Sequence, residues 1–275
     1  MYKIVRREEL NQTVTLMEIE APEIAEKCKP GQFIILRVDE YGERIPLTIA
    51  SYDPDLGTIT IIFQIVGLST RKLNELQVGD EILDFVGPLG KPSRLEGITK
   101  ACVVVGGVGS AIGYPIAKEL HNQGAMVDTI VGFRTKDLII LENEFSEVSS
   151  NLYLVTDDGS YSRKGLVTDV LAELLEQEKY DVVIAIGPLP MMKYVSLLTK
   201  KYDQKTVVSM NPIMIDGTGM CGGCRLSVKG QVKFACVDGP EFDAFEIDFD
   251  EAISRSKMYQ KEEREKDCRL MKNEG

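Results

Sequence analysis

The stretch Ala101-Cys-Val-Val-Val105-Gly106-Gly107-Val108-Gly109-Ser110-Ala111 decides the fold class. Five apolar residues predict a short buried strand, and the glycines lead from it into a helical pattern that runs to Asn122. Glycines between a strand and a helix let backbone amides approach a dinucleotide pyrophosphate. The spacing departs from G-x-G-x-x-G, because Gly113 falls one residue late, so the loop is not a standard Rossmann fingerprint.

The same alternation continues from residue 99 to 210. Short apolar runs predict strands at Ala101–Val105, Met126–Val131, Asn151–Val155, Asp181–Ile186 and Thr206–Val208. Amphipathic stretches predict helices at Ala111–Asn122, Leu138–Phe145, Leu166–Glu176 and Met191–Tyr202. This order predicts a five-stranded parallel sheet with helices on both faces, and ligands in such sheets bind beyond the carboxyl ends of the strands.

Further strand ends carry residues suited to a ligand. Asp157 and Asp158 follow the third strand, and Gly187-Pro188 precedes Met191 after the fourth. Filling of the core is the alternative role for Met191. The two aspartates would repel a 2′-phosphate and accept hydrogen bonds from a ribose, which favours NADH over NADPH. Arg134, after the second strand, argues the other way, because an arginine can pair with that phosphate.

Residues 1–98 have a different pattern, made of short alternating runs separated by turn residues. Expected strands are Tyr2–Arg7, Thr13–Glu20, Phe33–Val38, Leu47–Tyr52, Thr58–Ile65 and Glu81–Val86, and one short helix is expected at Ser69–Leu76. The pattern predicts a small antiparallel Greek-key barrel.

Two segments of this barrel suit ligand binding. The first is the run that begins at Arg44 and continues as Pro46-Leu47-Thr48-Ile49-Ala50. The second is Val66-Gly67-Leu68-Ser69-Thr70, which opens the short helix. A helix amino end offers free N–H groups to a pyrophosphate, although Ser69 could equally be an ordinary helix cap.

A cysteine segment follows both regions. Cys221, Cys224 and Cys236 are spaced Cys-x2-Cys-x11-Cys among four glycines, and Asp216 lies five residues before the first of them. A [2Fe-2S] cluster takes four anionic ligands, so three thiolates and the Asp216 carboxylate form a candidate set. A disulfide or a zinc site is the alternative. The only histidine, His121, is more than a hundred residues away, so the usual nitrogen ligand of zinc is missing.

The overall composition limits the function. The formal net charge is -11, which argues against non-specific binding to nucleic acid or to an anionic membrane. No apolar run approaches the ~20 residues of a membrane span, and the sequence starts with strand-like alternation, so we expect a cytoplasmic protein. Cys28, Cys102 and Cys268 lie in unrelated contexts and are expected to be packing or surface thiols.

In combination, these parts resemble the ferredoxin-NADP reductase superfamily. The similar branch carries a [2Fe-2S] cluster after the nucleotide domain and includes dihydroorotate dehydrogenase B electron-transfer subunits and small subunits of NADH-dependent reduced ferredoxin:NADP oxidoreductases. The resemblance implies an FAD-binding barrel at 1–98, an NAD-binding domain at 99–210, a cluster segment at 211–247 and a charged tail at 248–275.

The resemblance also implies roles for individual residues. Pro46-Leu47-Thr48 matches the strand that holds the flavin, with Arg44 displaced by one position from the usual arginine. The other implied roles are the FAD pyrophosphate for Gly67, Ser69 and Thr70, the pyridine nucleotide for Gly107 and Gly109, and the nicotinamide floor for Gly187-Pro188.

The implied function is electron transfer between NAD(H), FAD and the cluster, with no catalytic acid or base. The implied partner is a larger redox subunit with a second flavin, in a bifurcating complex that serves ferredoxin indirectly. The alternatives are the same role beside dihydroorotate dehydrogenase or a hydrogenase, or a non-enzymatic module stabilised by zinc. Apolar residues just before the charged run from Lys257 to Lys272 suit docking on the partner or packing on the second domain: Phe245, Ile247, Phe249 and Ile253.

Overall fold

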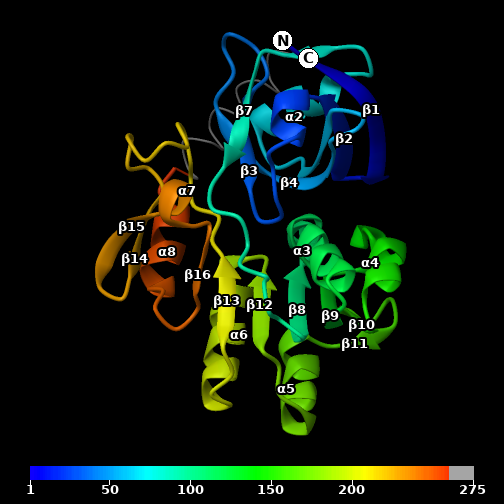
Figure 1. The fold of residues 1–275 in the computed structure, drawn as a ribbon, viewed down its shortest axis with the longest axis vertical. Helices are drawn as coiled ribbons and strands as arrows, with labels where there is room; N and C mark the ends of the chain where they lie inside the picture. The colour runs from blue at the N-terminus through cyan, green and yellow to red at the C-terminus, as the bar shows by residue number, and fades with distance from the viewer. Residues whose placement is uncertain (260–275) are drawn as a thin grey trace.

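The computed structural model describes residues 1–259, and Cys268 lies outside them. Figure 1 shows a strand-rich part that contains the amino terminus, a sheet with helices, and a smaller carboxyl-terminal part beside both. Within residues 1–259 the longest helices have 13 residues, and none has both the length and the hydropathy of a membrane span.

The amino-terminal part is an antiparallel barrel whose seven strands pair in the order β6-β1-β2-β5-β4-β3-β7. The strands are β1 (Tyr2–Asn11), β2 (Val14–Glu20), β3 (Phe33–Arg37), β4 (Ile45–Asp53), β5 (Thr58–Gln64), β6 (Glu81–Ile82) and β7 (Asp84–Leu89). The helices are α1 (Pro22–Ala25) and α2 (Leu68–Glu75). The barrel prediction is confirmed in architecture. The single strand predicted at Glu81–Val86 is two strands, because β6 pairs with β1 and β7 pairs with β3 at the other edge.

The second part is a sheet in the order β11-β10-β9-β8-β12-β13-β16. Its strands are β8 (Lys100–Gly106), β9 (Met126–Phe133), β10 (Asn151–Thr156), β11 (Arg163–Lys164), β12 (Val182–Ile186), β13 (Thr206–Ser209) and β16 (Glu241–Asp243). All five predicted strands are present and parallel. The short β11 adds a parallel edge, and β16 adds an antiparallel one that brings the cysteine segment against the sheet.

Helices cover both faces of this sheet. The helices are α3 (Ser110–Asn122), α4 (Glu142–Val148), α5 (Val167–Gln177) and α6 (Leu189–Lys201), with 3-10 turns at Gly107–Gly109 and Lys136–Leu138. The apolar sides of α3 and α4 share one core, and those of α5 and α6 share the other. The helix predicted at Leu138–Phe145 is wrong in position. Leu141 has a left-handed φ of 59°, so α4 begins only at Glu142.

The carboxyl-terminal part packs on the second. It contains the hairpin β14 (Arg225–Val228) and β15 (Gln231–Phe234), then α7 (Ala235–Asp238) and α8 (Phe249–Ser256). Phe249 is 7% exposed and shares a core with α6, and Phe245 and Ile247 pack against the same core. Packing on the chain's own second part is therefore observed for these three residues, whereas Ile253 is not in that core, and docking on a partner stays a prediction.

A buried polar network closes the amino end of the sheet, opposite the carboxyl strand ends. Asp128 of β9 is 2% exposed and accepts hydrogen bonds from the Tyr180 hydroxyl at 2.7 Å and the Asn151 amide at 2.8 Å. The Tyr180 hydroxyl also lies 2.9 Å from Glu178, which pairs with Lys100. Burial, together with these carboxylates, raises the pKa of Tyr180.

Tyr180→Phe should destabilise the fold, because it removes a donor from a buried carboxylate. The expected loss is about 1–3 kcal/mol in the free energy of unfolding, measured by urea titration. Tyr41→Phe is the matched control, since Tyr41 is 89% exposed, and its midpoint should stay at the parent value. Equal midpoints for the two variants would contradict a structural role for the Tyr180 hydroxyl.

Candidate functional site

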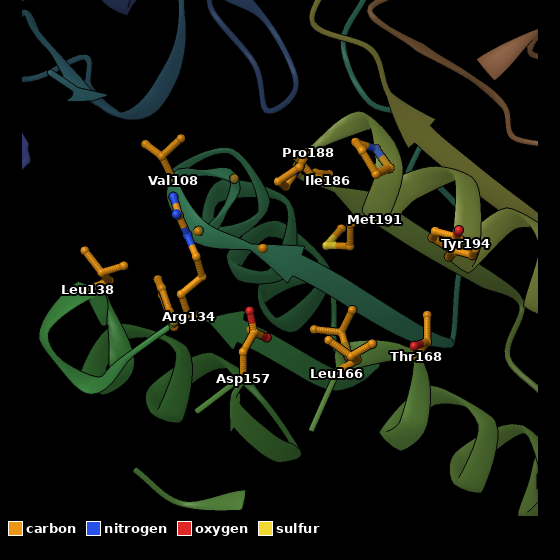
Figure 2. Close-up of a pocket in the computed structure, with 18 of the residues that line it drawn as sticks. Val108, Arg134, Leu138, Asp157, Leu166, Thr168, Ile186, Pro188, Met191 and Tyr194 are labelled. Carbon is orange, nitrogen blue, oxygen red and sulfur yellow. The ribbon is translucent and has the colours of Figure 1, made fainter. Parts of the chain in front are cut away.

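A cavity of about 1080 Å³ lies at the carboxyl ends of the parallel strands and reaches the barrel (Figure 2). Asn11, Thr13, Val14 and Gln64 line its barrel side. The structure brings together eight of the residues predicted for a nucleotide: Gly106, Gly107, Gly109, Arg134, Asp157, Gly187, Pro188 and Met191. The cavity lies where the strand order reverses between β8 and β12, which is where open α/β sheets bind ligands.

Glycine is present at these cavity positions for two different structural reasons. A Cβ on Gly109 would lie 2.6 Å from the Ile186 carbonyl oxygen, and one on Gly106 would lie 2.5 Å from the Met191 sulfur. Gly109 needs glycine because the backbone at the end of β12 lies close to it, whereas a side chain at Gly106 would displace Met191 of α6. Gly107 differs, since it has a φ of 56° and a Cβ there would meet nothing within 4 Å. Its missing side chain leaves space on the cavity side for a ligand to approach the backbone.

The two neighbouring aspartates do not act together. Asp157 lines the cavity with Arg134, and Figure 2 shows both side chains there. Asp158 is absent from the lining, and its Oδ1 accepts hydrogen bonds from the Ser160 hydroxyl at 2.7 Å and the Ser160 amide at 2.9 Å. These bonds lower the pKa of Asp158. Of the aspartate pair, only Asp157 is placed to meet a ligand in the cavity.

The sequence analysis missed one wall of the cavity. The start of α5 contributes Leu166, Thr168 and Asp169, and α6 contributes Tyr194, Leu197 and Lys201. Tyr194 is 63% exposed and Leu197 is 49% exposed, which is unusual for large apolar residues on a covering helix. The spacing of Met191, Tyr194 and Leu197 puts all three on one helix face, and this spacing could have predicted the α6 part of the wall from the sequence.

The predicted flavin strand β4 has two faces. Leu47 and Ile49 belong to the barrel core, so a ligand outside the barrel would meet only their backbone. Pro46 and Thr48 pair with Ile35 and Phe33 of β3, whose side chains belong to the core outside the barrel. The Thr48 hydroxyl is half-buried and has no hydrogen-bond partner in the described part of the chain, so it is available to a ligand on this outer face.

Two other predicted flavin residues already have partners in the chain. Arg44 lies 3.7 Å from Asp84, which also binds Arg37 at 2.7 Å. At the start of α2, the Thr70 hydroxyl oxygen accepts hydrogen bonds from the Val66 and Gly67 amides at 2.9 and 3.1 Å. Gly67 is the N-cap residue of α2, and the Thr70 hydroxyl, in the first helical turn, satisfies its amide.

The rest of the α2 amino end is open. No hydrogen bond involves the Ser69 hydroxyl within residues 1–259, and a Cβ on Gly67 would meet nothing within 4 Å. This end of α2 fits a phosphate-bearing group.

The cysteine loop is arranged around Asp216. Its Oδ2 accepts a hydrogen bond from the Cys221 amide at 2.7 Å, and its Oδ1 accepts from the Thr218 amide and, at 2.7 Å, from the Thr218 hydroxyl. These hydrogen bonds, of which the one from the Thr218 amide has the largest effect, hold the pKa of Asp216 well below its usual range. The carboxylate is therefore ionised, as a metal ligand must be, and it is tied to the backbone of Cys221.

The thiols of this segment differ in burial. Cys224 and Cys236 are buried with their sulfur atoms 3.2 Å apart, whereas Cys221 is exposed and its sulfur accepts a hydrogen bond from the Gly223 amide at 3.5 Å. Burial raises the pKa of Cys236 to about 12, so a bound metal would have to displace its proton. Within residues 1–259, no three histidine, cysteine, aspartate or glutamate side chains are already close enough together to hold a metal ion.

The donor set still fits an iron–sulfur cluster. Two adjacent thiols, a third on a glycine loop and an ionised carboxylate tied to that loop supply four anionic donors. His121 lies exposed on α3 and offers no nitrogen ligand here. Cys28 and Cys102 are buried elsewhere, as expected of packing thiols.

Gly107→Ala should weaken NADH binding several-fold, because a methyl group would enter the cavity at the glycine loop. Gly124→Ala is the matched control, since Gly124 also has a positive φ, 83°, with nothing within 4 Å of a Cβ, but lies outside the cavity lining. Fluorescence titration with NADH measures both variants. Equal weakening in the two would assign the effect to backbone strain and contradict the proposed contact.

Comparison with known proteins agrees with this geometry. Residues 211–248 match the iron-sulfur cluster binding domain of dihydroorotate dehydrogenase B. The chain is 45% identical over 273 residues to the dihydroorotate dehydrogenase B electron transfer subunit homolog of Thermotoga maritima, covering 99% of this chain and 96% of that one. It is 32% identical to the electron transfer subunit of that enzyme from Geobacillus sp., covering 89% and 96%.

A solved structure of an NADH-dependent reduced ferredoxin-NADP oxidoreductase, described as informing flavin-based electron bifurcation, contains a similar chain. It superposes with a TM-score of 0.93 at 43% identity and covers 98% of both chains. The ferredoxin-NADP reductase-like fold expected from the sequence is confirmed. The chain belongs to the family of dihydroorotate dehydrogenase B electron-transfer subunits and their homologues.

Proposed function

We propose that this protein is the flavin and iron–sulfur electron-transfer subunit of a larger NAD(H)-dependent oxidoreductase. The observation that carries the proposal is the single cavity that joins the glycine loop of β8, the end of β12 and the barrel. In that cavity a nicotinamide nucleotide can lie next to the barrel. Bound FAD would accept a hydride from NADH and release electrons singly to a [2Fe-2S] cluster.

The chain's own residues supply binding and orientation. Gly107 leaves room at the glycine loop, and Gly187-Pro188 forms the wall at the end of β12. The outer face of β4, with Pro46 and Thr48, and the open end of α2 at Gly67 and Ser69 are the proposed flavin contacts. Asp216 and the three cysteines at 221, 224 and 236 hold the cluster. No general acid or base is needed for these steps.

The proposed partner is a larger flavin and iron–sulfur subunit in a bifurcating complex, with ferredoxin served through that partner. Support comes from 43% identity over nearly the whole chain to a protein whose structure concerns such a complex. Relatives named dihydroorotate dehydrogenase B subunits include one at 32% identity, and the same role beside that enzyme is the second candidate.

We also propose that the protein works in a reducing compartment, the cytoplasm. Cluster binding needs thiolates at all three cysteine positions, and a disulfide between Cys224 and Cys236 would remove two of them. Their sulfur atoms are near enough for this to happen without large movement, so oxidising conditions would compete directly with the cluster.

The cluster proposal is tested by Cys236→Ser, with Cys28→Ser as the control that removes another buried thiol. The visible spectrum, iron content and acid-labile sulfide should show the cluster lost in the first variant and kept in the second, with FAD present in both. Asp216→Cys should keep the cluster and shift its reduction potential. Stoichiometric zinc without sulfide in the parent protein would support the zinc module and overturn the proposal.

The nucleotide preference is tested by Asp157→Ser and Asp158→Ser. We expect the parent protein to favour NADH. Loss of a negative charge from the cavity should raise kcat/KM for NADPH relative to NADH several-fold in the first variant. The second should match the parent, because Asp158 is held by Ser160 outside the lining. Equal use of both nucleotides by the parent protein would refute the preference.

A further inference from the structure

Strand β3 connects the barrel to the cysteine segment through its outer face. Alternate residues Ile34 and Leu36 belong to the barrel core. Phe33 and Ile35, which point the other way, belong to a core that also contains Cys224, Leu226 and Cys236. The apolar packing that holds the two buried thiols is therefore continuous with the wall of the barrel.

The cysteine loop touches this wall at Gly217. Gly217 has a φ of 79°, and a Cβ there would lie 2.6 Å from Leu89 Cδ1 of β7 and 2.9 Å from Ile35 Cδ1 of β3. Any side chain at this position would therefore have to displace the loop or the two methyl groups. Gly217 adjoins Asp216 in the sequence, so the contact lies next to a proposed cluster ligand.

The contact leads directly to the flavin strand. Ile35 is the pairing partner of Pro46 on β4, and Leu89 pairs with Phe33, whose partner on the other side is Thr48. In an antiparallel pair the side chains of partners lie on the same face. The loop backbone at Gly217 therefore lies against the same face of the barrel as Pro46 and Thr48, on the strand next to β4.

A second contact joins the residues after β7 to the same segment. The Lys91 amide donates to the Gly239 carbonyl oxygen at 2.7 Å, and a Cβ on Gly90 would lie 3.0 Å from Pro240 Cδ. The cysteine segment is therefore held between the barrel and the sheet on two sides. Because the barrel and the sheet both hold this segment, we expect a methyl group at Gly217 to move the loop.

We propose that Gly217 is a positioning residue that sets the distance between the cluster and the flavin by seating the cysteine loop on Ile35 and Leu89. The inference rests on the proposed function. The rate of single-electron transfer falls steeply with the distance between the two centres. The contact of Gly217 with Ile35 and Leu89 would therefore fix the rate of the flavin-to-cluster step, which the residues of the nucleotide cavity do not control. Gly217 is not among the residues that line the nucleotide cavity.

The test is Gly217→Ala, compared with Gly230→Ala. Gly230 also has a positive φ, 70°, but its Cβ would meet nothing within 4 Å, so it reproduces the backbone strain without the collision. In anaerobic stopped-flow, NADH delivers a hydride, and the reduced flavin then passes single electrons through the cluster to ferricyanide, each ferricyanide taking one. Flavin bleaching by NADH should be unchanged in both variants.

Cluster reduction should be several-fold slower in Gly217→Ala than in Gly230→Ala, because the rate of single-electron transfer falls as the distance between the flavin and the cluster grows. Adding Leu89→Ala to Gly217→Ala makes room for the methyl group and should recover part of the rate. In the chain without cofactors, hydrogen exchange of the Thr218 and Cys221 amides, which Asp216 holds, should accelerate in Gly217→Ala only.

The results distinguish a failure of the proposed function from a failure of the positioning role of Gly217. A parent protein that binds neither FAD nor a cluster would overturn the proposed function. If the parent protein transfers electrons but Gly217→Ala matches Gly230→Ala in cluster reduction and in amide exchange, the positioning role of Gly217 is wrong and the proposed function stands. Slower flavin bleaching in Gly217→Ala would also count against the positioning role, because the effect would then lie in the nucleotide site.

Discussion

The burial of strand β8 on both faces is the constraint on which the rest of the structure depends. Cys102 and Val104 belong to one core, and Ala101, Val103 and Val105 belong to the other. A parallel strand of this kind needs cover on each side. Both cores also extend into the barrel, one through Phe33 and Ile35 and the other through Val14, Leu16, Ala50 and Ile62. The barrel is thus held from two directions, and at the cavity the Asn11 amide also donates a hydrogen bond to the Leu138 carbonyl oxygen at 3.2 Å.

Crowding at the strand ends explains why the glycine loop departs from the usual spacing. Gly109 allows β8 and β12 to approach, Gly106 fits against Met191 of α6, and Gly113 fits against Val105 on the core side of α3. Only Gly107 has open space and a left-handed backbone. A pattern of four glycines therefore contains three that serve packing and one that serves access. Sequence spacing cannot separate these roles, because each depends on a partner distant in the chain.

Periodicity predicted the barrel, the five parallel strands and the two-faced cover, since each depends on local alternation of apolar residues. It failed where a distant partner decides, as at Leu83, where the chain leaves one barrel edge for the other, and at Leu141, where a left-handed turn delays α4. At the site, the strand ends were predictable because parallel strands finish together. The split between Asp157 and Asp158 was not, because it depends on a hydrogen bond to Ser160.

Strand β4 separates the two sides of the proposed electron path. Pro46, Thr48 and Ala50 alternate onto one face, and at about 3.3 Å per residue they span about 13 Å. Ala50 packs in the core that contains α3, next to the glycine loop. Pro46 pairs with Ile35, in the core that contains Cys224 and Cys236. A flavin on this face would meet a nucleotide toward one end and the cysteine loop toward the other. One face of one strand can therefore keep a two-electron donor and a one-electron acceptor apart.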